Sequence, residues 1–220
     1  MMKKIILVFI LFSAFLLGIS LKTHANDEME SFRLVVLGDS LATGYGLSPE
    51  AGYIALLKNV LKKDGLDNVS IIDAAVAGQR TSDGLAMMPS ILAKRPHAAI
   101  VELGINDALQ GVNGQEIQKN LETIVSMFLN NDIPVMLIGV KPPVVSAIRN
   151  RDELPMIYKA VAKKYKLAFY PHFLDGVLIE RMGTYDFKYL QNDTVHPNEA
   201  GVYIMLKKTY PVIKKFLMSL

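Results

Sequence analysis

Short apolar runs alternate with longer amphipathic stretches along this chain, and this alternation constrains the fold more than any other feature. The runs are rich in Val, Ile and Leu and do not alternate strictly with polar residues, which is typical of strands buried on both faces. They lie at residues 33–37, 69–74, 98–103, 135–140 and 167–170. The stretches between them have the apolar spacing of helices. They lie near residues 52–63, 82–94, 115–130 and 154–166.

Strands that alternate with helices predict an α/β domain, with a parallel sheet that helices cover. A last helix is expected to begin near Pro197, because proline is favoured at the first helical position, and to end near Phe216. Ligands of such sheets bind at the carboxyl ends of the strands. No internal repeat, low-complexity tract or linker divides residues 26–220, which predicts one domain with a sizeable core.

Residues 1–25 have the pattern of a Sec-type signal peptide. Lys3 and Lys4 precede an apolar run over residues 5–21, and small residues occupy the last and third-last positions before an expected cleavage site after Ala25. The alternative is an uncleaved membrane anchor, because the run reaches the lower limit of a spanning helix, roughly 17 residues. Cleavage predicts a periplasmic or secreted domain without stable membrane insertion. No Cys follows the run, so a lipoprotein anchor is not expected.

Charge and cysteine content narrow the class of function. The net charge of the whole chain is +3, and Lys3, Lys4 and Lys22 of the expected signal peptide account for all of it. The domain that follows therefore lacks the basic excess that nucleic-acid or anionic-membrane binding would require. The chain contains no cysteine, so the fold uses no disulfide, and a thiol nucleophile or thiolate metal ligand is excluded.

Four short motifs in a fixed order carry the residue types of a serine hydrolase. Three of them follow predicted strands and contain Ser40, Gly78 and Asn106, and the fourth precedes the last helix and contains Asp193 and His196. Because parallel strands end at one edge of a sheet, the first three are expected to gather there. Each motif alone also fits an ordinary role, such as a helix N-cap, a turn residue or a surface histidine. Their joint occurrence favours catalysis.

The catalytic interpretation gives each of these residues a role. Ser40 is the candidate nucleophile and His196 the base that accepts its proton, since a serine hydroxyl is a poor nucleophile by itself. Asp193 would orient the imidazole and stabilise its charged form. The backbone N–H groups of Ser40 and Gly78 and the side-chain amide of Asn106 would form an oxyanion hole.

Other residues around the motifs limit the alternatives. Asp39 and Asp107 each adjoin a candidate catalytic residue and are expected to hold their loops through hydrogen bonds from backbone N–H groups. Ala42 stands where the nucleophile elbow of α/β-hydrolases has a glycine, which argues against that class. No His/Asp cluster has the spacing of metal ligands, so neither a metal nor another cofactor is expected.

The four motifs resemble the signature blocks of the SGNH (GDSL) esterase/lipase superfamily, and within it the periplasmic group of acyl-thioesterase I, lysophospholipase L1 and arylesterase. The segments that carry the resemblance are 37–45, 73–78, 101–111 and 193–198. At matching positions the resemblance implies Ser40, Asp193 and His196 as the triad and Ser40, Gly78 and Asn106 as the oxyanion hole. It also implies a three-layer α/β/α sandwich with a flavodoxin-like, five-stranded parallel sheet of order 2-1-3-4-5.

The resemblance implies a monomer that hydrolyses acyl esters, thioesters or lysophospholipids through an acyl-enzyme. That group usually has a second glycine before the asparagine, where this chain has Ile105. A bulky residue there could stiffen or narrow the loop 104–111, so Ile105 and Leu109 are candidate substrate-binding residues. Apolar residues of segment 142–155 could line an acyl groove, and Arg149 and Arg151 could meet an anionic head group. An ordinary charged surface connection fits that segment equally well.

Two other functions stay open. One is a carbohydrate acetylesterase with the same fold and triad. The absence of tryptophan weakly disfavours it, since sugar sites often use large aromatic platforms. The other is a non-catalytic lipid-binding module, against which the retention of every catalytic group argues. Acyl chain length and the balance of esterase and thioesterase activity are not fixed by these motifs.

Overall fold

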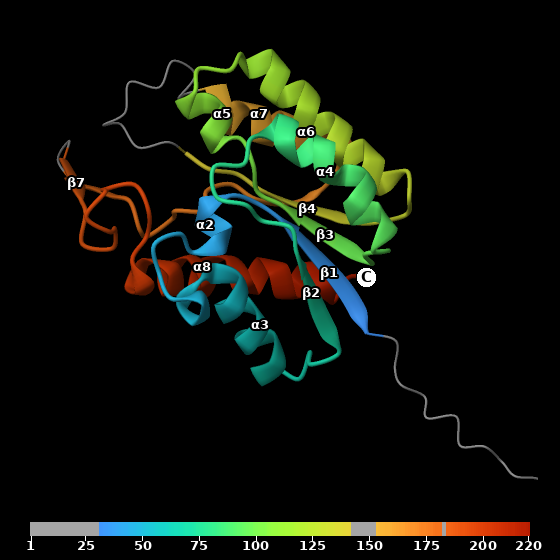
Figure 1. The fold of residues 1–220 in the computed structure, drawn as a ribbon, viewed down its shortest axis with the longest axis horizontal. Helices are drawn as coiled ribbons and strands as arrows, with labels where there is room; N and C mark the ends of the chain where they lie inside the picture. The colour runs from blue at the N-terminus through green and yellow to red at the C-terminus, as the bar shows by residue number, and fades with distance from the viewer. Residues whose placement is uncertain (1–30, 142–152, 182–183) are drawn as a thin grey trace, which may run out of the picture. The chain divides into compact units, whose positions relative to one another are not determined.

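A five-stranded parallel sheet forms the middle layer of the structure, a computed structural model (Figure 1). Its strands are β1 (Phe32–Leu37), β2 (Val69–Asp73), β3 (Ala98–Val101), β4 (Val135–Ile138) and β5 (Ala168–Tyr170). Their order is β2-β1-β3-β4-β5, and each neighbouring pair is parallel. This order confirms the predicted α/β fold.

The structure describes residues 31–141, 153–181 and 184–220. The expected signal peptide and both Arg149 and Arg151 lie outside these ranges. Residues Ser31–Leu220 form one compact unit. In the described ranges, no helix combines the length and the apolar character that crossing a membrane requires.

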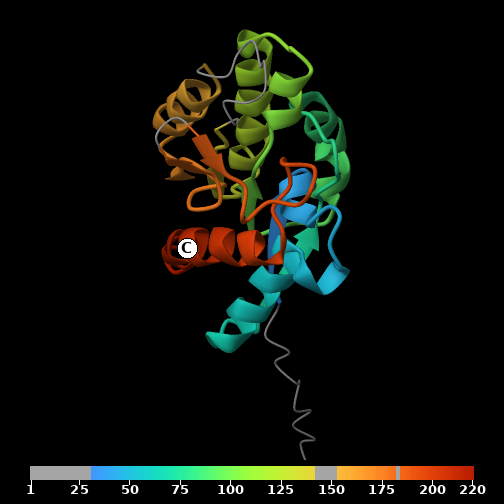
Figure 2. The same cartoon turned by 90° about the vertical axis from the view of Figure 1, so that its left-hand side faces the viewer.

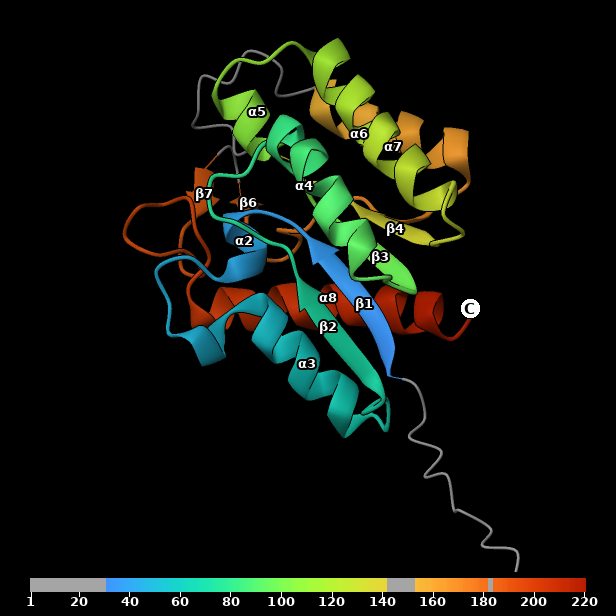
Figure 3. The ribbon, with the colours of Figure 1, turned by 45° about the vertical axis from the view of Figure 1, so that its right-hand side comes forward.

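Helices cover both faces of the sheet. On one face α3 (Tyr53–Lys63) packs against α8 (Glu199–Leu217), and on the other α6 (Gly114–Leu129) packs against both α4 (Thr81–Ala93) and α7 (Glu153–Tyr165). Figure 2 shows the same two groups of helices from the side, and Figure 3 shows them with their labels. The molecule therefore has the three α/β/α layers that the resemblance implied.

Burial along the strands follows from these layers. Every residue of β3 and β4 is buried, as are the last four residues of β1. Strands covered on both faces need apolar side chains at consecutive positions, which explains the continuous runs in the sequence. The strands β2 and β5 lie at the edges of the sheet and are only partly buried.

The last helix begins at Glu199, close to Pro197 as predicted, but Pro197 precedes the N-cap and is not itself the first helical residue. The backbone of Pro197 instead pairs with Leu190 in an isolated antiparallel bridge. Asn198 caps the helix, and its side chain accepts a hydrogen bond from the N–H of Gly201. A polar N-cap satisfies a free backbone donor, which a proline at the first turn cannot do.

Several short elements were not predicted. They are α2 (Ser40–Thr43), the 3₁₀ turn η1 (Pro49–Ala51), α5 (Ile105–Leu109) and the antiparallel pair β6 (Ile179–Arg181) and β7 (Thr184–Asp186). Elements of this length show no helical or strand period in a sequence. Two of them, α2 and α5, follow strand ends and begin within the sequence motifs.

Candidate active site

Ser40, Asp193 and His196 lie together in the structure. His196 Nε2 is 3.0 Å from the hydroxyl oxygen of Ser40, and His196 Nδ1 is 2.6 Å from Asp193 Oδ2. A neutral imidazole that donates to a carboxylate through Nδ1 can accept a proton from a serine through Nε2. The three side chains therefore have the order and spacing that proton transfer from Ser40 requires.

The turn between β1 and α2 positions Ser40. Asp39 caps α2, because its Oδ1 accepts a hydrogen bond of 2.9 Å from the N–H of Leu41. A Cβ at Gly38 would lie 2.8 Å from Cβ of Ala42, closer than real Cβ atoms approach, so only glycine fits at the end of this strand. Ser40 is therefore the first residue of a short helix, and both Gly38 and Asp39 fix the backbone that leads into it.

The loop that carries Asp193 and His196 is organised around the carboxylate. Asp193 Oδ1 accepts hydrogen bonds of 2.9 Å from the backbone N–H groups of Val195 and His196, which leaves Oδ2 for the imidazole. Partial burial would raise the pKa of Asp193, but the hydrogen bonds from His196 and Val195 together lower it. Asp193 therefore stays ionised at every pH at which His196 could act as a base.

Gln191 connects this loop to the nucleophile side of the site. Its side-chain Nε2 donates to the backbone oxygen of Tyr45 at 2.7 Å and to that of Pro197 at 2.9 Å. Its backbone N–H donates to the oxygen of His196 at 2.7 Å. Gly46 has a φ of 80°, which favours glycine, and a Cβ there would also contact Gln191 Oε1. No sequence motif pointed to Gln191.

A pocket of about 340 Å³ opens beside the serine. Its lining residues are Ser40, Tyr45, Ala77, Gly78, Asn106 and His196. Gly78 has a φ of 81°, which favours glycine, and a Cβ placed there would meet no atom within 4 Å. The structure thus brings all three candidate oxyanion-hole residues to one pocket, together with the nucleophile and the base.

Tyr45 and Ala77 line the pocket although neither was predicted as a site residue, and Tyr45 is the larger of the two. Its ring lies 4.8 Å from the imidazole of His196, centroid to centroid, at an interplanar angle of 44°. The side chain is 54% exposed, so it forms an aromatic wall at the mouth of the pocket. The available signal was an aromatic residue between Gly44 and Gly46, directly after the serine motif.

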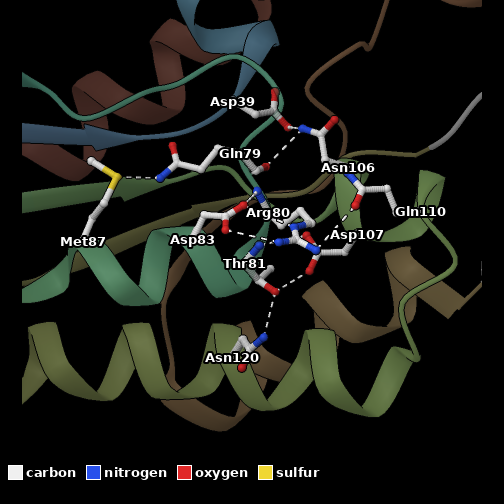
Figure 4. A network of polar contacts seen from close by, with 10 residues as sticks. All are labelled: Asp39, Gln79, Arg80, Thr81, Asp83, Met87, Asn106, Asp107, Gln110 and Asn120. Carbon is white, nitrogen blue, oxygen red and sulfur yellow. Dashed lines mark hydrogen bonds and ion pairs between the residues drawn. The ribbon is translucent and has the colours of Figure 1, made fainter.

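The amide of Asn106 is held by two acceptors, as Figure 4 shows. Its Nδ2 lies 3.1 Å from Asp39 Oδ2 and 3.1 Å from the backbone oxygen of Gln79. An amide nitrogen has two N–H groups, so each of them already faces an oxygen. If Asn106 is the oxyanion donor that the sequence predicts, the oxyanion would have to share one of these two N–H groups.

Asp107 anchors α5, the short helix that also carries Asn106. Its carboxylate accepts hydrogen bonds from the backbone N–H of Thr81 at 2.8 Å and from the Thr81 hydroxyl at 2.5 Å. Asn120 of α6 donates to the same hydroxyl at 3.1 Å. Burial raises the pKa of Asp107 despite the bonds from Thr81. As the sequence predicted, Asp39 and Asp107 hold their loops by accepting backbone N–H bonds.

A second buried carboxyl, Glu102, lies beside Asp39. Its Oε2 accepts a hydrogen bond of 3.4 Å from the backbone N–H of Asp39, and its Oε1 has no partner among the described residues. Burial and the adjacent Asp39 carboxyl raise the pKa of Glu102 well above its ordinary value. Burial also raises the pKa of Asp39, to about 7.

Neither Ile105 nor Leu109 belongs to the lining of the pocket beside Ser40. Ile105 is 8% exposed and packs in the hydrophobic core, whereas Leu109 is 48% exposed at the end of α5. Their part in substrate binding stays a prediction. Among the described residues no group of three or more His, Asp and Glu side chains could hold a metal ion.

Known proteins resemble the chain over most of its length. The model of the GDSL-like Lipase/Acylhydrolase family matches residues 36–203. Esterase TesA of Pseudomonas aeruginosa is 32% identical over 186 residues, which cover 84% of this chain and 89% of that protein. Thioesterase 1/protease 1/lysophospholipase L1 of Escherichia coli strain K12 is 28% identical over 204 residues, covering 90% and 91%. A crystal structure of TesA matches with a TM-score of 0.76 at 31% identity, covering 83% of this chain and 98% of that one.

Proposed function

Because this chain belongs to the GDSL-like lipase/acylhydrolase family and is a hydrolase of ester bonds, we propose that it cleaves acyl esters and thioesters through an acyl-enzyme on Ser40. The observation that carries the proposal is the hydrogen-bonded series from Ser40 through His196 to Asp193. The names of the relatives support this range of substrates, since one is an esterase and another a thioesterase and lysophospholipase.

In the acylation step, Ser40 attacks the carbonyl carbon of the substrate while His196 Nε2 accepts the hydroxyl proton. The carbonyl oxygen becomes an oxyanion in the tetrahedral intermediate. When this intermediate collapses, the bond to the leaving alcohol or thiol breaks, and the imidazolium gives its proton to that group. The acyl chain is then bound to Ser40, and His196 is neutral again.

In the deacylation step, a water molecule takes the place of the leaving group. His196 removes a proton from the water, whose oxygen attacks the acyl carbon, and a second tetrahedral intermediate forms. Its collapse releases the carboxylic acid and returns the proton to Ser40. Asp193 stays ionised and stabilises the imidazolium in both steps, because its pKa is held low by the hydrogen bonds from His196 and Val195.

Three N–H donors would stabilise the oxyanion: the backbone groups of Ser40 and Gly78 and the amide of Asn106. All three residues line the pocket beside the nucleophile. Stabilisation of this charge is usually the largest single term in such a reaction. Tyr45 would limit the same pocket on the side of His196 and contact the substrate there.

The remaining part of the proposal concerns location and substrate. We infer that residues 1–25 direct export and are cleaved after Ala25, which would leave a periplasmic or secreted, monomeric enzyme. Its substrates would be small acyl molecules such as aryl esters, acyl thioesters and lysophospholipids. Amino-terminal sequencing of the protein recovered from a periplasmic extract tests this: a chain that begins at Met1 would contradict it.

A p-nitrophenyl ester series from acetyl to palmitoyl tests the reaction and the acyl length together. The protein is assayed beside Ser40→Ala, and Ser90→Ala serves as the matched control, because that exposed hydroxyl on α4 donates to the oxygen of Met87 and to no other atom of the described residues. We expect turnover with Ser40→Ala to be lost and turnover with Ser90→Ala to be unchanged. Turnover that survives in Ser40→Ala would contradict the proposed nucleophile.

The chain-length profile separates the remaining alternatives. A maximum at medium or long chains supports the acyl-lipid substrates, whereas activity confined to acetyl esters would favour a carbohydrate acetylesterase. Acetylated xylose and an acyl-coenzyme A thioester should be assayed in parallel. Stoichiometric lipid binding without turnover of any ester would favour a binding module.

A further inference from the structure

Glu102 and Asp39 form a pair of buried carboxyl groups next to the nucleophile. Asp39 is fully buried and Glu102 is 1% exposed. Among the described residues, the other titratable groups that act on this pair are Asp107 of α5 and the phenols of Tyr53 on α3 and Tyr158 on α7. None of these groups can supply a positive charge. An ionised Glu102 beside an ionised Asp39 would therefore be an uncompensated buried charge.

The hydrogen bonds around the pair indicate which member carries the proton. Both oxygens of Asp39 accept from N–H donors, Oδ1 from Leu41 and Oδ2 from Asn106. Donors of this kind favour the ionised form of a carboxyl group. Glu102 accepts only one long bond, and its Oε1 has no partner among the described residues. The proton of the pair therefore belongs on Glu102.

Asp39 connects this pair to the oxyanion hole. Above about pH 7, where Asp39 is ionised, the bond from Asn106 to Asp39 has a charged acceptor, whereas the bond from Asn106 to the Gln79 oxygen has a neutral one. Charge-assisted hydrogen bonds are roughly twice as strong as neutral ones. Asp39 therefore fixes the orientation of the amide, and the N–H that faces Gln79 is the one available for an oxyanion.

We propose that Glu102 is a positioning residue: as a neutral acid it keeps Asp39 in place to hold the oxyanion donor Asn106, and its ionisation limits hydrolysis at alkaline pH. The inference rests on the proposed function, in which Asn106 stabilises the oxyanion. It adds a residue that touches neither the substrate nor the triad and acts only through Asp39.

The crowding around Asp39 explains why a negative charge on Glu102 would affect the position of Asn106. Gly38, the residue before Asp39, packs against the Glu102 carboxyl group. A Cβ at Gly38 would lie only 3.2 Å from Glu102 Oε2. Two like charges in this space repel each other and disfavour the present geometry. The turn that carries Asp39 then has to shift, and Asp39 Oδ2 moves away from the amide that it orients.

The test compares the pH dependence of kcat for the protein and for Glu102→Gln. The substrate is a p-nitrophenyl ester of the length that is turned over fastest, with product read at a wavelength that does not depend on pH. We expect kcat of the unaltered protein to fall about tenfold per pH unit above the ionisation of Glu102. In Glu102→Gln this alkaline decline should disappear, since glutamine has the same shape and no proton to lose. Identical pH profiles would overturn the proposal.

A matched control is Glu122→Gln, which removes a partly buried glutamate of α6 that pairs with Lys164, outside the pocket beside Ser40. Its profile should follow that of the unaltered protein. A second experiment repeats Glu102→Gln in an Asn106→Ala background, where activity is low but measurable. If Glu102 acts through Asn106, the substitution should no longer change the alkaline limb. A change of the same size in both backgrounds would mean that Glu102 acts on Ser40 instead, and would overturn the assignment.

Infrared spectroscopy of the unaltered protein keeps the proposal testable if Glu102→Gln does not fold. With glutamate side chains labelled at the carboxyl carbon, the band of a protonated carboxylic acid should persist above neutral pH and disappear where kcat falls. Absence of that band at neutral pH would overturn the proposal. Failure of the proposed function is a different result, namely ester hydrolysis that persists in Ser40→Ala.

Discussion

At the scale of single residues, the site depends on side chains that are already bonded before substrate arrives. Asn106 is the clearest case, because each of its amide N–H groups faces an oxygen, one from Asp39 and one from Gln79. Replacing it by alanine removes a proposed oxyanion donor and also leaves Asp39 with one hydrogen bond fewer. The two losses can be separated by measuring activity and folding together.

Asn106→Ala should reduce kcat by about a hundred- to a thousandfold, the usual effect of losing one oxyanion donor. The matched control is Asn120→Ala, which removes an amide of the same network that donates to Thr81 and does not line the pocket. Steady-state kinetics and thermal unfolding of both variants provide the test. If both variants lost the same fraction of kcat, the amide of Asn106 would have a structural role only.

Sequence motifs predicted the individual candidate residues better than the contacts between them. Ser40, Gly78 and Asn106 were expected to gather because parallel strands end at one edge of the sheet, and they do line one pocket. The bond from Asn106 to Asp39 was not foreseen, since it joins side chains from two motifs that are far apart in sequence. No periodicity in the chain encodes a contact of that kind.

At the scale of elements, the loop between β7 and α8 is fixed to the rest of the site by Gln191. Its side chain bonds the backbone oxygens of Tyr45 and Pro197, and its backbone N–H bonds the oxygen of His196. These contacts position the base relative to the turn that follows the nucleophile. The loop itself has no regular secondary structure that could do so.

Gln191→Ala should lower kcat, by up to about a hundredfold if the imidazole moves by 1 Å. The physical reason is that the loop of His196 loses the contact that aligns it with Ser40. Gln118→Ala is the matched control, because Gln118 lies on α6 and bonds only Glu122. A kinetic comparison on one aryl ester is sufficient, and unchanged kcat in Gln191→Ala would show that the loop is held by other contacts.

The main helices and strands were predicted correctly in kind because each has a clear hydrophobic period, whereas α2 and α5 are too short to have one. The start of α8 was predicted to within two residues, and its exact position has a different origin. Pro197 has a local preference for the first helical turn, but its pairing with Leu190 and the cap from Asn198 determine where the helix begins.

At the scale of the whole molecule, the buried pair of Asp39 and Glu102 should make stability depend on pH. At a pH well below 3.8, the ordinary pKa of an aspartate, the folded and unfolded chains both keep the Asp39 proton. Between 3.8 and about 7 the unfolded chain releases this proton and the folded chain does not, so the free energy of unfolding falls. The pKa of Glu102 is also raised, so this group extends the decrease in the free energy of unfolding to higher pH.

Glu102→Gln should therefore have a higher melting temperature than the unaltered protein at pH 8, and the difference should shrink at pH 4. Each kcal/mol corresponds to about 2–4 °C in a domain of this size. Calorimetry across this pH range checks the prediction, with Glu122→Gln again as the control. A difference that does not depend on pH would mean that Glu102 is not protonated in the folded protein.

The two hydrogen bonds that the Asn106 amide already makes also affect how strongly it would bind the intact ester compared with the transition state. An ester carbonyl is a neutral acceptor, so replacing the neutral oxygen of Gln79 with it gains little free energy. The oxyanion that forms during attack is a charged acceptor and does gain from the exchange. If the reaction proceeds as proposed, the resting site would favour the charge that develops along the reaction coordinate, and Asn106 would accelerate turnover without tightening the binding of the intact ester.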